Sequence, residues 1–311
     1  MEIDNLSIDF RLYESSDLEQ ILYLYRVCFG DHTTNTFIQK LLSGDTSVLD
    51  WKYKNSMRVV ALDRDRIIGH SGTQQRKMIY GNKEINVAES VDLMVVPEFR
   101  RRGVATKLER YRENILLDQR VDMFLGFPNK LSEALMRTRS PEIPLYAIPL
   151  LEKTNLISKP WNDVYEIKEF GEDVNKLPNS IDCTTKREPA YLNWRFVENP
   201  LNSYDIFVQR TEQTQGYVIL KKYNQTGHVV DFMADSHETL VNLLKFSEDY
   251  FSKKDMKAMS AYVISGSSYY DDFVKHGFVN KNIDRTFWVT PLNKKLEINK
   301  FHLTMMDHDV F

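Results

Sequence analysis

The stretch VVPEFRRRGVATKL, residues 95–108, decides how this sequence is interpreted. An apolar run ends at Pro97, three arginines occupy positions 100–102, and a helix is predicted to begin after Gly103. The first amides of a helix have no acceptor inside it, and the helix dipole adds partial positive charge at that end. Acidic side chains are normally favoured there, so three arginines indicate a compensating anion, and the small residues Gly103 and Ala105 let it approach the backbone. The stretch therefore predicts a site for a pyrophosphate-like group.

The composition limits the partners that such a site could serve. The chain has 311 residues and a net charge of −3, which argues against indiscriminate binding to nucleic acid. No apolar run reaches the roughly 18 residues that a membrane span needs, and the acidic start does not resemble a secretion signal. Cys28 and Cys183 lie far apart, and no pair of histidines has the spacing of metal ligands. We therefore expect a cytoplasmic protein that binds no metal, nucleic acid or membrane, and whose basic stretch binds a local anion.

The sequence contains two similar halves. Two motifs recur in the same order, namely LDWKY (49–53) and VDLM (91–94), then LNWRF (192–196) and VDFM (230–233). Matching order and nearly equal spacing favour an ancient duplication over chance. Between the halves, at residues 152–178, the periodicity weakens and prolines appear. We therefore predict one domain over residues 1–155 and a second over residues 156–311.

The first half has the pattern of a mixed α/β unit. Apolar residues at helical spacing predict helices, and β-rich runs bounded by turn residues predict strands. In chain order, the predicted elements are a helix at 15–29, a hairpin at 57–80, a strand at 86–96, a helix from 104, a strand at 121–127 and a short helix at 131–137. This order is typical of a sheet flanked by helices. At the other end of the chain, the tail at 301–311 is predicted to form a final strand.

The segment VDLMVVPEFRRRGVATKL resembles the central motif of the GNAT superfamily of acyl-CoA-dependent N-acetyltransferases, [Q/R]xxGx[G/A] between a strand and a helix. Arg100, Gly103 and Ala105 match its three fixed positions. The second half lacks this motif, although SSYYDDFVKHGF (267–278) resembles the closing segment of the superfamily. The resemblance implies two tandem GNAT-like domains, each a mostly antiparallel twisted sheet flanked by helices, the second degenerate and without a pyrophosphate loop. Similar tandem arrangements occur in mycothiol synthase and in acetyltransferases of the enhanced-intracellular-survival type.

The resemblance also implies acetyl-CoA as cosubstrate and a set of residues that hold it. The implied set is Met94, Val95 and Val96 for the pantetheine arm, Arg100, Arg101, Arg102, Gly103, Val104, Ala105 and Thr106 for the pyrophosphate, and Asn129. The thioester would lie where the motif strand separates from the strand at 121–127. Asn129 follows a proline, and a simple turn residue is the alternative interpretation for it.

Acyl transfer requires a neutral amine, and deprotonating a lysine-like amine at pH 7 costs about 4.6 kcal/mol. Glu89 lies 11 residues before Arg100, the spacing at which some members of the superfamily carry a catalytic glutamate, so the resemblance implies it as the leading candidate for the base, and Asp92 is the second. Strand alternation places these two carboxylates on opposite faces unless a bulge intervenes. Met136 occupies the position of the superfamily's usual tyrosine acid, which leaves Tyr146 as the candidate acid, although a tyrosine in PLYAIPLL is more typical of a core. Without an acid the thiolate could leave unaided, because a thiol has a pKa of roughly 8.5.

The leading prediction is an acetyl-CoA-dependent N-acetyltransferase that acetylates a primary amine, such as an amino sugar or another small amine. Three alternatives remain open. They are a catalytically silent CoA-binding regulator or scaffold, an aminoacyl transferase of the peptidoglycan-bridge type, and a nucleic-acid binder that uses the arginines at 100–102. The sequence leaves open the acceptor, the acyl chain length and whether the chain forms a homodimer.

Overall fold

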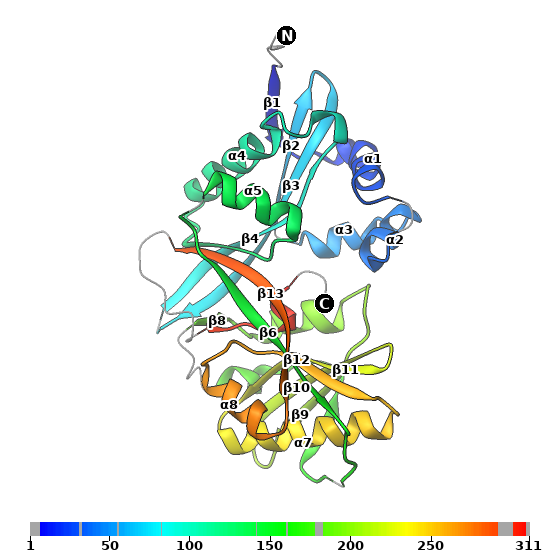
Figure 1. Cartoon of the computed structure of the whole chain (residues 1–311), viewed down its shortest axis with the longest axis vertical. Coiled ribbons are helices and arrows are strands. Elements are labelled where there is room, and N and C mark those ends of the chain that lie inside the picture. The colour runs from blue at the N-terminus through cyan, green and yellow to red at the C-terminus, as the bar shows by residue number, and fades with distance from the viewer. Residues whose placement is uncertain are drawn as a thin grey trace. The chain divides into compact units, whose positions relative to one another are not determined.

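The computed structural model describes residues 7–30, 33–54, 56–81, 83–140, 142–159, 161–177, 183–291 and 301–308 (Figure 1). The chain forms two compact units. Unit 1 consists of Met1–Arg76, Ile85–Leu145 and Trp288–Lys294, and unit 2 consists of Lys77–Glu84, Tyr146–Phe287 and Lys295–Phe311. Each unit therefore includes a short segment from the other half of the chain. The predicted domains, 1–155 and 156–311, are contiguous and do not include this exchange of segments.

Unit 1 is built on a sheet with the strand order β1, β2, β3, β4, β5 and the end of β13. The strands are β1 (Ile8–Leu12), β2 (Met57–Asp63), β3 (Arg66–Tyr80), β4 (Lys83–Val95), β5 (Met123–Gly126) and β13 (Val279–Pro291). The helices are α1 (Leu18–Phe29), α2 (Thr36–Leu42), α3 (Ser47–Lys52), α4 (Val104–Asp118) and α5 (Lys130–Arg139). β4 and β5 run parallel, whereas β1, β2 and β3 pair antiparallel and β5 pairs antiparallel with β13.

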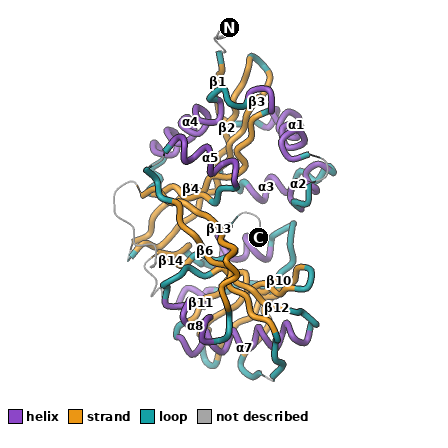
Figure 2. The backbone as a smooth tube through the Cα atoms, in the orientation of Figure 1, coloured by secondary structure: helices purple, strands orange, loops and turns teal. Residues whose placement is uncertain are grey.

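Unit 2 has a sheet with the strand order β13, β6, β12, β11, β10, β9 and β7. Its remaining strands are β6 (Leu145–Thr154), β7 (Val164–Ile167), β8 (Cys183–Thr185), β9 (Asp205–Arg210), β10 (Thr214–Tyr223), β11 (Thr226–Ala234), β12 (Ala258–Tyr262) and β14 (Phe301–His302), and its helices are α6 (Pro189–Leu192), α7 (His237–Lys253) and α8 (Ser268–Lys275). Figure 2 shows the same path with helices and strands distinguished. Among the described residues, no helix has the length and apolar character needed to cross a membrane.

The two units repeat one connectivity, which accounts for the echoes in the sequence. Unit 1 runs β2, β3, β4, α4, β5 and α5, and unit 2 runs β9, β10, β11, α7, β12 and α8. In both units the fourth strand is parallel to the third, as β4–β5 and β11–β12 are. In unit 1, β5 pairs with β13, which comes from the second half of the chain. In unit 2, β12 pairs with β6, which comes from the first half. The last strand of each half therefore belongs to the sheet of the other unit. The predicted class, a mixed α/β fold on mostly antiparallel sheets, is confirmed.

The repeated motifs place buried charges in both units. In unit 1, Asp92 forms an ion pair of 2.8 Å with Lys52, and in unit 2, Asp231 forms one of 2.8 Å with Arg187. Arg195, from the motif that repeats Lys52, donates to the main chain of the tail, at 2.7 Å from the His308 oxygen. The tail was predicted to be a strand, but of its described residues, 301–308, only Phe301 and His302 pair as one. Its following residues turn to satisfy buried partners instead.

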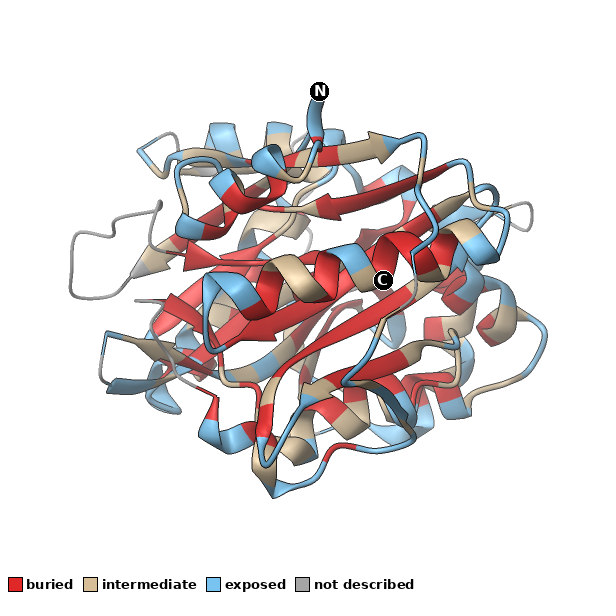
Figure 3. Cartoon of the chain, turned by 90° about the horizontal axis from the view of Figure 1, so that it is seen from below, coloured by how far each residue is buried: buried red, intermediate tan, exposed pale blue. Residues whose placement is uncertain are grey.

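A buried polar cluster fixes α4 to the sheet of unit 1. Arg112 Nη1 donates to Ser71 Oγ at 3.0 Å on β3 and to Ser90 Oγ at 2.6 Å on β4, and Arg112 Nη2 donates to Glu109 at 2.9 Å. Figure 3 shows the general pattern, in which buried residues follow the strands and helices alternate buried and exposed positions. Through these hydrogen bonds, the buried Arg112 side chain ties α4 to both β3 and β4.

Candidate functional site

The arginine corner joins β4 to α4 through the 3-10 turn Pro97–Phe99. Gly103 has a φ of +78° and precedes the helix, and no side chain among the described residues caps it. The first intrahelical hydrogen bond of α4 runs from the Lys107 amide to the Gly103 oxygen at 3.1 Å. The amides of the first turn, Val104, Ala105 and Thr106, consequently have no acceptor within the helix. Val104 is buried, which anchors this turn while Gly103 stays exposed.

The three arginines of the corner differ in what they contact. Arg100 Nε donates to the Val95 oxygen at 2.9 Å, so this side chain braces the corner itself. The Arg102 guanidinium lies over the Phe99 ring at 5.6 Å, and Arg101 is exposed with a φ of +61°. Within the described ranges neither Arg101 nor Arg102 forms an ion pair with a carboxylate. Two cationic side chains therefore remain at the helix start for an external anion.

The corresponding corner of unit 2 has the opposite chemistry. Ser236 caps α7, and its Oγ accepts a hydrogen bond of 3.2 Å from the Thr239 amide. Asp235 precedes the cap and Glu238 lies in the first turn, so acidic groups occupy the position of the arginines. A capped helix start with negative side chains disfavours a phosphate. The features that favour an anion thus occur at α4 and not at α7.

β4 and β5 separate beside the corner. The two strands pair from Val87 to Ser90 and no further, although β4 continues to Val95. Asp92 has a φ of +50°, which bends β4 just after the pairing ends. Beyond the bend, the Val96 amide donates to the Ile68 oxygen at 3.0 Å. The predicted pantetheine residues, Met94, Val95 and Val96, follow this bend and are buried.

The Asp92 carboxylate is the centre of a hydrogen-bonded group that we call the Asp92 cluster: Tyr25, Lys52, Tyr53, His70 and Asp92. The tyrosine hydroxyls of Tyr25 and Tyr53 donate to Asp92 at 2.7 and 2.5 Å, and Lys52 completes the ion pair. Burial, followed by the Asp92 charge, raises the pKa of both tyrosines well above the usual value. Both hydroxyls are therefore protonated and act as donors near neutral pH.

His70 lies on β3 inside the same cluster and is fully buried. Its Nδ1 is 3.0 Å from the main-chain oxygen of Asp92, and since a carbonyl only accepts, Nδ1 carries the proton. Burial lowers the pKa of His70 to about 4, so the ring is neutral near pH 7. Its Nε2 is buried and has no hydrogen-bond partner among the described residues.

Glu89 is buried and forms an ion pair of 2.8 Å with Arg76. Arg76 and Gln74 point to the same face of β3 because they are two residues apart, and Gln74 donates to the Lys52 oxygen at 3.1 Å. Glu89 and Asp92 consequently lie on the same face of the sheet. Opposite faces were expected only for a regular strand, and the positive φ of Asp92 interrupts the regular alternation of β4.

The other predicted site residues have local roles. Asn129 caps α5, and its Oδ1 accepts from the amides of Leu131 and Ser132 at 3.0 Å each. Tyr146 belongs to unit 2, where its ring packs 5.5 Å from that of Phe287. The arrangement of Asn129 agrees with the turn interpretation.

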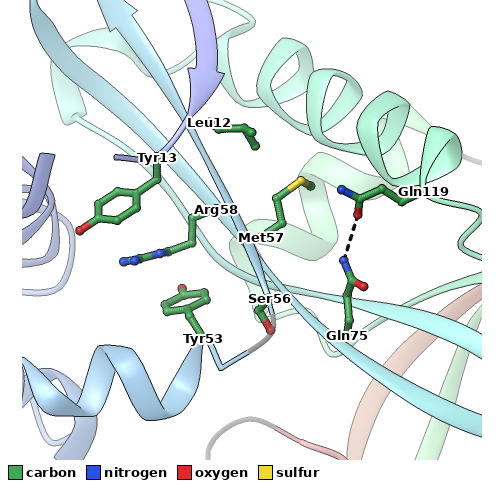
Figure 4. Close-up of a pocket in the computed structure, with 8 residues that line it drawn as sticks. All are labelled: Leu12, Tyr13, Tyr53, Ser56, Met57, Arg58, Gln75 and Gln119. Carbon is green, nitrogen blue, oxygen red and sulfur yellow. Dashed lines mark hydrogen bonds between the residues drawn. The ribbon is translucent and has the colours of Figure 1, made fainter. Parts of the chain in front are cut away.

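The sequence analysis missed a cavity of about 470 Å³ in unit 1 (Figure 4). It is lined by Leu12, Tyr13, Tyr53, Ser56, Met57, Arg58, Gln75 and Gln119. The Arg58 guanidinium lies between two rings, 3.5 Å from the centre of Tyr13 and 4.8 Å from that of Tyr53. The only sequence signal was a basic residue within the β-rich run MRVVAL, which by itself is too common to indicate a site.

Comparison with known proteins identifies the fold of the chain and the family of a domain in its first half. The family described as Acetyltransferase (GNAT) domain matches residues 9–136. A probable N-acyltransferase from Enterococcus faecalis, described as a conserved protein of unknown function, is 10% identical with a TM-score of 0.68, and a GCN5-related N-acetyltransferase from Anabaena variabilis is 11% identical with a TM-score of 0.69. Each match covers 92% of this chain and 73% of the other.

A third structure resembles the chain over nearly its full length. It is a putative acetyltransferase from Pyrococcus horikoshii, 11% identical, with a TM-score of 0.59 and 96% of each chain covered. No curated protein sequence is significantly similar to the chain. Residues 9–136 match the GNAT acetyltransferase domain family, and the solved structures share the fold over most of the chain.

Proposed function

We propose that this chain transfers an acetyl group from acetyl-CoA to a primary amine of a small acceptor, and that the arginine corner of unit 1 holds the cofactor. The observation that carries the proposal is the uncapped start of α4, where Gly103 has a positive φ and two arginines have no carboxylate partner among the described residues. A diphosphate supplies the acceptors and the negative charge that this helix start requires.

The cofactor site is proposed to be largely preformed. The Arg112 cluster fixes α4 to β3 and β4, and Arg100 braces the corner on the Val95 oxygen. The amides of Val104, Ala105 and Thr106 are thus oriented before the cofactor arrives. Preorganised donors cost little to align, so they contribute more to affinity than mobile ones.

The reacting thioester is proposed to lie where β4 leaves β5, next to the bend at Asp92. There the amine would attack the thioester carbon, the oxygen would take the negative charge, and main-chain amides near Val95 would stabilise it. The thiolate then leaves with the C–S electron pair, and the amine loses its proton. Glu89 is the proposed acceptor of that proton, because it lies on β4 at the end of the stretch that pairs with β5, next to the point where the two strands separate.

A second candidate is a CoA-binding protein without turnover. The observation that favours it is the engagement of both carboxylates, Glu89 with Arg76 and Asp92 with Lys52. Each carboxylate already contacts a cation of the protein, so neither has been shown to contact a substrate amine, and an amine bound in its charged form would not be activated.

One experiment separates the two candidates. The full chain is titrated with acetyl-CoA by calorimetry, and free thiol is then measured across a panel of amines. Binding with amine-dependent thiol release supports the transferase. Binding without thiol release on any amine supports the silent protein, and the absence of binding refutes both. In the transferase, Glu89→Gln is expected to lower kcat by about 100-fold or more, the usual range for a general base.

A further inference from the structure

We infer that the cavity beside Tyr53 binds an anionic group of the acceptor, so that the preferred substrates are amines that also carry a carboxylate or a phosphate. The inference rests on the proposed function and names the substrate class of that site. It begins with Arg58, whose position in the cavity is visible in Figure 4.

Arg58 is held in a way that leaves only its edge for a ligand. The rings of Tyr13 and Tyr53 cover the two faces of its guanidinium, at 3.5 and 4.8 Å from the ring centres. A stacked guanidinium presents its N–H groups in one plane, which is the geometry that binds two oxygens of a carboxylate or phosphate. The clamp therefore selects for an oxyanion in the plane of the group.

Arg58 has no anionic partner in the described part of the chain. Its Nη1 is buried and makes no hydrogen bond there. The neighbouring carboxylate of Asp17 is occupied by Arg11, which donates to both of its oxygens at 2.7 Å. A buried donor of a charged group that lacks an acceptor is costly, and a bound oxyanion would remove that cost.

Tyr53 connects this cavity to the Asp92 cluster. Its ring forms one wall of the cavity, while its hydroxyl donates to Asp92 at 2.5 Å. The ring also lies against Gly72, where an added Cβ would be 2.6 Å from it, so the ring has little room to move. Tyr53 therefore contacts the proposed oxyanion site with its ring and Asp92, where β4 bends, with its hydroxyl.

The rest of the cavity suits a small polar molecule. Its volume of about 470 Å³ is within the usual range for small-molecule sites. Gln75 and Gln119 contribute amides, which lie 3.3 Å apart, and Ser56 contributes a hydroxyl. Met57 and Leu12 add apolar surface. An acceptor could therefore bind with its anion on Arg58 and its carbon skeleton along the polar wall.

The test uses the full chain with amines in matched pairs, an α-amino acid with its carboxamide and glucosamine 6-phosphate with glucosamine. The first pair detects a carboxylate and the second a phosphate. Wild type is expected to prefer the anionic member of at least one pair. Arg58→Met should raise KM for that member by about 10- to 100-fold, the loss of one charge-assisted pair of hydrogen bonds, while KM for its neutral counterpart stays near that of wild type.

Two further variants keep the result interpretable. Arg58→Lys keeps the charge without the planar fork and should give an intermediate KM. Arg110→Met removes an exposed arginine of α4 and should change neither member of a pair. Thermal unfolding identifies variants that fail to fold. If Arg58→Met is unfolded, two results test the inference instead. They are the preference of wild type for the anionic member of a pair and the KM of Arg58→Lys for that member.

The outcomes separate this inference from the proposed function. Turnover of neutral and anionic amines with equal KM would overturn the inference and leave the transferase intact. Acetyl-CoA binding without turnover of any amine would overturn the proposed function. In that case, calorimetric titration with both matched pairs decides the inference, which requires that the anionic member of at least one pair binds more tightly than its neutral counterpart and that Arg58→Met abolishes this difference.

Discussion

The replacement of Gly103 by alanine separates the folding role of this residue from its role in binding. Gly103 has a φ of +78°, a conformation that costs an L-residue about 1 kcal/mol. An added Cβ would meet no described atom within 4 Å, so no steric cost is added to this strain. We expect Gly103→Ala to lower the free energy of unfolding by about 1 kcal/mol and the Tm by a few degrees.

Cofactor affinity should fall much more than stability. The new methyl group would occupy the exposed space through which a diphosphate reaches the first amides of α4. Losing even one hydrogen bond to a charged group costs about 1.5–3 kcal/mol, so the Kd for CoA should rise by at least about tenfold. Isothermal titration calorimetry with CoA measures this change, and urea unfolding measures the stability of the same preparation.

Gly81 provides a matched control. It also has a positive φ, +59°, and an added Cβ there would likewise meet no described atom within 4 Å. Gly81→Ala should therefore show a similar loss of stability with unchanged CoA affinity. If Gly103→Ala binds CoA as tightly as Gly81→Ala does, the pyrophosphate does not dock at the start of α4 and the reasoning is refuted.

Three further predictions concern the buried groups of unit 1. Asp92→Asn removes the charge that compensates the buried ammonium of Lys52, and should destabilise the protein by about 3–5 kcal/mol in urea unfolding. The pKa of His70 is about 6.5 in the unfolded chain and about 4 in the folded chain. As the pH falls from 6.5 to 4, the unfolded chain therefore binds a proton that the folded chain does not, and the free energy of unfolding falls by up to about 1.4 kcal/mol per pH unit. His70→Asn should reduce that slope. Gly126→Ala would place a Cβ 2.6 Å from the Trp288 indole nitrogen, and should cost about 1–3 kcal/mol by the same assay.

Each of these predictions has its own control. Glu98→Gln breaks the exposed ion pair with Arg66 and should cost less than about 1 kcal/mol, so an equal loss from Asp92→Asn would contradict the importance of burial. A pH slope unchanged by His70→Asn would mean that His70 is not held neutral. A Gly126→Ala protein as stable as wild type would show that Trp288 moves aside at little cost.

The sequence predicted the parts of the site that depend on neighbouring residues. The arginine corner could be recognised because a strand end, a glycine and the start of an amphipathic helix follow each other within 14 residues. The alternative role of Asn129 as a turn residue was accessible for the same reason, since a cap depends on the next three residues.

Features that depend on distant pairing could not be predicted in this way. The bend at Asp92 is stabilised by Tyr25, Lys52 and Tyr53, which come from two helices and a turn far earlier in the chain. The exchange of β6 and β13 follows from strand pairing between the two halves, for which periodicity carries no signal. The Arg58 cavity likewise requires that Tyr13 and Tyr53 meet on opposite faces of one side chain.

The most direct test of the account is a crystal structure of the full chain with acetyl-CoA. The account predicts pyrophosphate oxygens about 3 Å from the amide nitrogens of Val104, Ala105 and Thr106, with the thioester where β4 leaves β5. A diphosphate bound elsewhere, with these amides facing solvent, would contradict it.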